Sequence, residues 1–141
     1  EYVFDNKLSS SILIGTAPHK GTITTYGQLF GGFYASIPKK TNGTKRGDID
    51  QARMQLLQQL LAAKLNCAAF GCSATIQGQI ANADAKYFSG TKAQILAAAG
   101  QMGAYNSSGD AYAIPSSLPA TGKATPKTSQ SYANLIFWNT P

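Results

Sequence analysis

The segment at residues 48–66 constrains the fold of this chain most, because its apolar residues recur with helical spacing over about five turns. The apolar positions are Ile49, Ala52, Leu56, Leu57, Leu60, Leu61, Ala63 and Leu65. The stripe they form is wider than a surface helix needs, so it predicts a central helix that is buried on several sides. Asp48 is expected to cap this helix, with Gln51 at the capping-box position.

Three further segments are predicted to be helices that pack around the central one. Residues 25–36 and 91–104 each begin with a threonine followed three positions later by a glutamine, which is the spacing of a capping box. Residues 73–88 carry their apolar side chains on one narrow helical face. The predicted fold class is α+β and mainly α, with a core of three or four helices and peripheral strands from both termini.

The two ends of the chain are predicted to be extended. Residues rich in β-branched and aromatic side chains occur near the N-terminus and again at 131–138, whereas residues 105–130 are rich in Ser, Gly, Pro, Thr and Ala. The length fits one domain. We therefore expect a single domain over residues 1–141, with an N-terminal arm of strands at 1–24, a helical core at 25–104, a surface loop at 105–130 and a C-terminal strand at 131–141.

Cys67 and Cys72 are the only cysteines, and they are separated by four residues. Zinc would need two further ligands that one histidine cannot supply, so a local disulfide is favoured, with two buried free thiols as the alternative. Gly71 gives the backbone freedom to close so small a ring. A structural disulfide indicates an oxidising compartment. The chain starts at Glu1 and not at Met, from which we expect a processed, secreted protein.

The chain is basic but has few groups that could do chemistry. It has 12 Lys and Arg against six Asp and Glu, a formal net charge of +6 and a single histidine. The cations cluster only at Lys39, Lys40, Lys45 and Arg46, which are candidates for contact with an anion or an acidic glycan. The others are scattered, which disfavours nucleic acid as a partner. We expect no catalytic residues, no cofactor, no metal and no membrane span, and therefore not an enzyme.

Three short motifs concern modification. Asn42 and Asn106 begin glycosylation sequons in predicted loops. Residues 118–122, LPATG, match the sortase sorting pentapeptide, although the membrane-spanning segment that this signal requires does not follow within the sequence. The sequence leaves open whether this motif is used.

The central part of the chain resembles a module of bacterial secreted and cell-surface proteins that carries a helix ending in LIAAKLN. The resemblance rests on residues 58–66, QQLLAAKLN, on residues 80–85, IANADA, and on residues 26–30, YGQLF, and it extends over about residues 22–104. The GFWKNHP stretch with which such modules open is missing here. The resemblance implies a secreted or surface setting, a helical core and a non-catalytic role, and it transfers no functional site.

We expect a secreted, non-enzymatic structural protein at the cell surface or outside the cell. Its copies would form a filament by terminal strand exchange, because a short apolar strand can add to the sheet edge of another copy. The alternatives are that these strands pack on their own core, and that the chain is a binding module for acidic glycan or cell wall. The expected assembly residues are Tyr2, Val3, Phe4, Ile12, Leu13, Ile14, Leu135, Ile136, Phe137 and Trp138.

Overall fold

The computed structural model describes residues 1–16, 19–118 and 141, and it confirms a mainly helical fold with a small sheet near the N-terminus. The predicted strand residues Leu135, Ile136, Phe137 and Trp138 and most of the LPATG motif lie outside the described residues. In chain order the elements are α1 (Tyr2–Lys7), β1 (Ile12–Thr16), β2 (His19–Ile23), α2 (Tyr26–Tyr34), α3 (Asp48–Phe70), α4 (Ala74–Ser89) and α5 (Lys92–Ser108).

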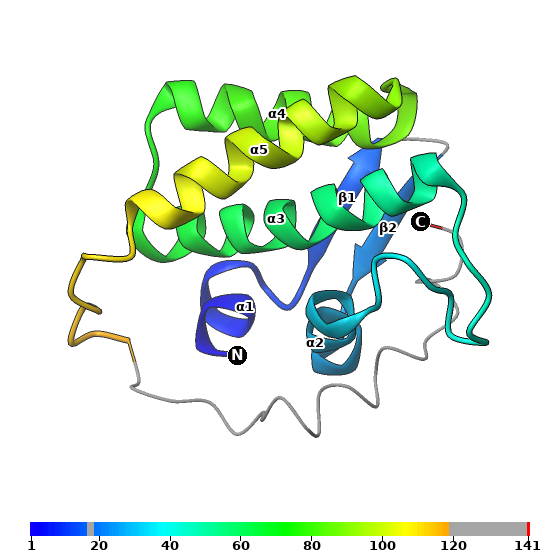
Figure 1. The fold of residues 1–141 in the computed structure, drawn as a ribbon. Helices are drawn as coiled ribbons and strands as arrows, with labels where there is room; N and C mark the ends of the chain where they lie inside the picture. The colour runs from blue at the N-terminus through cyan, green and yellow to red at the C-terminus, as the bar shows by residue number, and fades with distance from the viewer. Residues whose placement is uncertain (17–18, 119–140) are drawn as a thin grey trace.

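Helix α3 is the centre of the fold, as its sequence predicts. It contacts α1, α2, α4, α5 and β1. Helices α4 and α5 lie on one side of it and α1 and α2 on the other (Figure 1). Its buried residues are Ala52, Met54, Leu56, Leu57, Leu60, Leu61 and Ala63. The helix is one turn longer than predicted and ends at Gly71, whose φ of 76° other residues rarely adopt.

The predicted capping residues Thr25 and Thr91 are confirmed, and Ser73 caps α4 in the same way. The side chains of Thr25, Ser73 and Thr91 accept hydrogen bonds at the starts of α2, α4 and α5, and Thr91 forms a complete capping box with Gln94. The predicted cap at Asp48 is wrong, because Gly47 occupies the N-cap of α3. The carboxylate of Asp48 instead accepts a hydrogen bond from Lys92 Nζ at 3.0 Å.

The N-terminal residues Tyr2, Val3 and Phe4 form a helix, so their predicted strand is wrong. Three apolar residues are too few to distinguish the period of a helix from that of a strand. As a helix, α1 presents Phe4 to the core, where its side chain is 1% exposed. The side chain of Asp5 on the same helix accepts hydrogen bonds from Tyr26 and Ser10, which ties α1 to α2 and to the turn before β1.

Strands β1 and β2 form an antiparallel hairpin in which Ile12 pairs with Ile23 and Ile14 with Gly21. The side chains of Ile12, Ile14 and Ile23 are buried in the core, whereas Leu13 is 47% exposed. Of the N-terminal arm of strands predicted at 1–24, the parts at 12–16 and 19–23 are therefore confirmed as strands. Their inward side chains pack on this chain's own helices, chiefly α4 and α3.

An ion pair closes the edge of β1 that faces away from β2. Lys64 Nζ donates to the Leu13 carbonyl and to Asp84 Oδ2, the latter at 2.6 Å. Asp84 Oδ1 accepts from the Gly15 N–H at 2.9 Å. Two side chains from α3 and α4 thus satisfy the backbone groups that a third strand would otherwise pair with.

Candidate functional site

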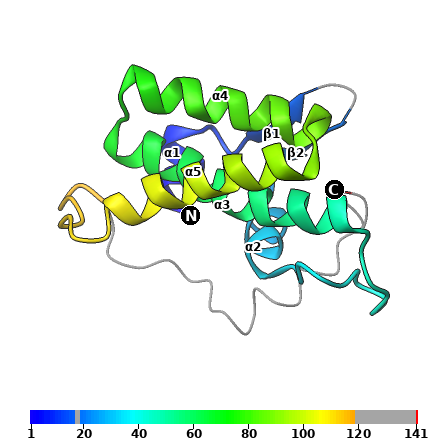
Figure 2. The same ribbon diagram turned by 45° about the horizontal axis from the view of Figure 1, so that its top comes forward.

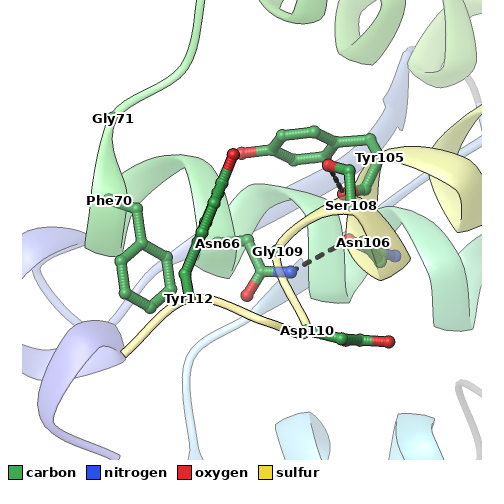
Figure 3. A pocket seen from close by; sticks show the side chains of 9 residues that line it. All are labelled: Asn66, Phe70, Gly71, Tyr105, Asn106, Ser108, Gly109, Asp110 and Tyr112. Atoms are coloured by element: carbon green, nitrogen blue, oxygen red, sulfur yellow. Dashed lines mark hydrogen bonds between the residues drawn. The ribbon is translucent and has the colours of Figure 1, made fainter. Parts of the chain in front are cut away.

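A pocket of about 290 Å³ opens where α3 and α5 end (Figure 3). Figures 1 and 2 show the turn after α5 at the C-terminal end of α3. The loop between α2 and α3 lies at the other end of that helix. The volume lies at the lower end of the roughly 300–1,000 Å³ that small-molecule pockets occupy. The lining residues are Asn66, Phe70, Gly71, Tyr105, Asn106, Ser108, Gly109, Asp110 and Tyr112.

The disulfide shapes one wall of the pocket. Cys67 and Cys72 are bonded, which confirms the predicted pairing, and the ring they close contains Phe70 and Gly71. The Gly71 N–H donates to the Cys67 carbonyl at 2.9 Å and closes the last turn of α3. Two wall residues are therefore held by a covalent ring and by a helix end, both of which limit their freedom before any ligand binds.

A chain of amide hydrogen bonds forms the polar floor. Asn66 Nδ2 donates to Asn106 Oδ1 at 3.1 Å, which joins the end of α3 to the end of α5. Asn106 Nδ2 donates to the carbonyl and to the side-chain Oε1 of Gln59, each at 3.0 Å. Asn106 has therefore used both of its amide protons. Asn66 Oδ1 has no hydrogen-bond partner among the residues that the structure describes, so an acceptor stays open at this floor.

Aromatic rings supply the apolar part of the lining. Phe70 and Tyr112 are 51% and 73% exposed, and Tyr105 is half-buried on α5. Figure 3 shows these three side chains around the pocket, from the end of α3, from α5 and from the turn after α5. Burial raises the pKa of Tyr105. Its phenol, which like that of an ordinary tyrosine is protonated at neutral pH, can donate a hydrogen bond. Exposed rings that surround a cavity provide faces for stacking.

The turn after α5 places Tyr112 and Asp110 at the rim. The Gly109 and Asp110 N–H groups donate to the carbonyls of Asn106 and Ser107, and the Tyr112 N–H donates to the Gly109 carbonyl at 2.9 Å. The Asp110 side chain is directed away from Phe70 and Tyr112 (Figure 3). No Lys or Arg occurs among the lining residues that the structure describes.

The predicted basic cluster lies at the other end of α3, and one of its members is not at the surface. Lys39 and Lys45 are exposed, and their backbones form an isolated antiparallel β-bridge across the loop between α2 and α3. Lys40 is half-buried. Arg46 is only 2% exposed, so its predicted contact with a glycan is wrong. Its Nε donates to the Ser36 carbonyl at 3.2 Å, which holds the guanidinium under the loop.

The two predicted glycosylation sites differ in their surroundings. Asn42 is exposed in a turn, where its Oδ1 accepts from the Thr44 N–H and from Thr44 Oγ1. Asn106 does not lie in a loop as predicted, because α5 continues to Ser108. Its Nδ2 is the nitrogen that would carry the sugar, and both of its protons are engaged with Gln59.

Three of the six predicted assembly residues in the described part belong to the chain's own core. Phe4, Ile12 and Ile14 are buried there, while Tyr2 and Leu13 are partly exposed and Val3 is half-buried. Within the described ranges no three His, Cys, Asp or Glu side chains come together in a way that could hold a metal ion. No helix of that same part is both long and apolar enough to cross a membrane.

Comparisons with protein-family models, curated proteins and solved structures find no match. The resemblance to the LIAAKLN-type module therefore stays a prediction.

The structure gives the polar residues of the QQLLAAKLN stretch definite roles. Gln58 Nε2 donates to the carbonyls of Gly32, Phe33 and Ala35 at 3.0–3.1 Å and so caps the end of α2. Gln59 holds Asn106, as described above. Lys64 reaches the hairpin, and Asn66 reaches α5. The polar residues of this stretch therefore attach α2, β1 and α5 to α3 by hydrogen bonds. Its last residue, Asn66, lines the pocket.

Sequence reasoning missed the pocket. The sequence does not predict Phe70, Tyr105 and Tyr112 as site residues, and residues 105–108 belong to α5 where a surface loop is expected. A signal was present in the aromatic and amide residues that follow the apolar stripes of both helices. These residues indicate a site only once the C-terminal ends of α3 and α5 are known to lie side by side.

Proposed function

We propose that this chain is a non-enzymatic binding module of the cell surface or extracellular space that holds a saccharide in the pocket between the ends of α3 and α5. The observation that carries the proposal is the combination of Phe70, Tyr105 and Tyr112 with the open acceptor of Asn66. Aromatic rings stack on the C–H faces of sugar rings, and amide and phenol groups exchange hydrogen bonds with sugar hydroxyls. The volume suits one or two sugar rings.

The construction of the site also favours binding. Two long helices carry its floor, and a disulfide ring carries one wall, so little ordering is required when a ligand enters. The disulfide is consistent with an oxidising compartment, where saccharides of the cell surface are found. The predicted preference for acidic glycan is not part of this proposal, because the described part of the pocket lining contains no cationic side chain.

Replacing Tyr112 with alanine is expected to weaken saccharide binding about tenfold while leaving the fold intact. Tyr112 is 73% exposed in a turn, so its ring contributes little to the core, whereas a stacked ring contributes about 1 kcal/mol to an apolar contact. The measurement is a calorimetric titration with oligosaccharides. Tyr34→Ala is the matched control, because Tyr34 is 38% exposed on α2, away from the pocket lining. Equal affinities of the Tyr112→Ala variant and the parent chain would contradict the proposal.

A second candidate, polymerisation by strand exchange, is favoured by the unequal edges of the hairpin. Since Lys64 and Asp84 bond to the outward groups of Leu13 and Gly15, the pairing pattern directs the N–H and C=O of Thr22 away from β1. These Thr22 groups have no partner among the described residues, and Thr22 is exposed. A strand from another copy could therefore add at β2 but not at β1.

Deletion of residues 131–141 tests this second candidate. The apolar segment 131–138 has the sequence of an added strand, so the shortened chain is expected to remain folded and monomeric under conditions in which the full chain forms particles. Light scattering and negative-stain microscopy measure particle size, and circular dichroism confirms the fold. If the shortened chain still polymerises, or if the full chain stays a monomer at high concentration, strand exchange is wrong.

A further inference from the structure

We infer that the saccharide held between α3 and α5 carries a free amine, as a hexosamine does, and that its ammonium group is recognised together with its ring. This inference rests on the proposed function and names the ligand class more narrowly. It follows from the Asp110 charge, from the dipoles of the two helix ends and from the open acceptor of Asn66, each of which favours a cation that donates hydrogen bonds.

The first step concerns the ends of the two helices. Both α3 and α5 terminate at the pocket with their C-termini, and each helix end carries about half a negative charge. These are long helices of 23 and 17 residues. A positive group near a helix C-terminus is stabilised, and an anion there is disfavoured. The two helix ends therefore contribute a negative potential at the pocket.

The second step concerns the side chains. Asp110 is the only residue with a formal charge among the described residues of the lining. Its carboxylate is exposed at the rim and directed away from Phe70 and Tyr112, and it adds to the negative potential there. The chain as a whole is +6, so this pocket has the opposite sign to the average of the molecule. Charges farther than about 8 Å from the pocket are largely screened at physiological salt.

The third step concerns what the pocket can offer in direct contact. The faces of Phe70, Tyr105 and Tyr112 attract cations through the negative potential above an aromatic ring. The open amide oxygen of Asn66 accepts hydrogen bonds but cannot donate them. An ammonium group has three donors and no acceptor, so it suits this set better than the acetamide or hydroxyl of an otherwise identical sugar.

The test is a titration of the full chain with three disaccharides that differ only in the group at carbon 2 of each ring. They are the glucosamine dimer, its N-acetylated form and cellobiose, at about pH 6, where the free amine is protonated. We expect the glucosamine dimer to bind about fivefold more tightly than the other two. We expect Asp110→Asn to reduce this preference about twofold, and high salt to reduce it further.

The matched control is Asp48→Asn, which removes the same charge at the far end of α3 and should leave the preference unchanged. If cellobiose or the acetylated dimer binds as tightly as the glucosamine dimer, the inference about the amine is overturned while the saccharide site stands. If none of the three binds, both the inference and the proposed function are wrong.

Discussion

Replacement of both Cys67 and Cys72 by serine is expected to lower the free energy of unfolding by about 2 kcal/mol and to weaken saccharide binding about tenfold. The first effect follows from the loss of a small covalent ring that restricts the unfolded chain. The second follows because Phe70 and Gly71 lie inside that ring and line the pocket. Ordering even one released residue upon binding costs about 1–2 kcal/mol of backbone entropy.

The measurement combines denaturant unfolding with a calorimetric titration, each with and without a reducing agent. The reduced parent chain should behave like the double serine variant, and the variant itself should not respond to the reductant. That comparison separates loss of the bond from any effect of the serine side chains. Unchanged saccharide affinity in the reduced parent chain would show that the wall of the pocket does not depend on the disulfide.

Truncation of Leu60 to alanine is expected to be the most destabilising of the changes considered, at about 3 kcal/mol. Leu60 is fully buried on α3, so its removal costs the transfer energy of the lost methyl groups and leaves a cavity that its neighbours fill only in part. Denaturant unfolding measures the effect. Leu13→Ala is the matched control, because Leu13 is 47% exposed and should cost about 0.5 kcal/mol or less. Equal costs at the two positions would contradict the central place of α3.

The helices could be predicted from sequence because their signals are local. The signals are the apolar stripe of α3, the capping box at Thr91 and the capping threonine at Thr25, and each lies within a few residues of the feature it determines. The segment at Tyr2–Lys7 has no comparable local signal. It packs on α3 as a helix, with Phe4 buried in the core of the domain. Local patterns therefore predict the long elements and fail for the short one.

The pocket could not be predicted, since it depends on contacts between residues far apart in the sequence. Asn66 and Asn106 are 40 positions apart and meet only because α3 and α5 pack together. Arg46 shows that neighbours in the sequence need not share a surface. It lies next to lysines in the sequence, but the Ser36 carbonyl holds it under the loop. Composition identified the scarcity of catalytic groups, but the placement of aromatic and amide groups required the tertiary structure.

The most direct test of the saccharide site is a map of backbone amide chemical shifts during titration with the disaccharide that binds most tightly. The account predicts that the shifts concentrate at Asn66, Phe70, Gly71 and the segment 105–112, which surround the pocket. Shifts confined to the loop that carries Lys39, Lys40 and Lys45 would contradict it, because that loop lies at the opposite end of α3 and would place binding on the basic cluster instead.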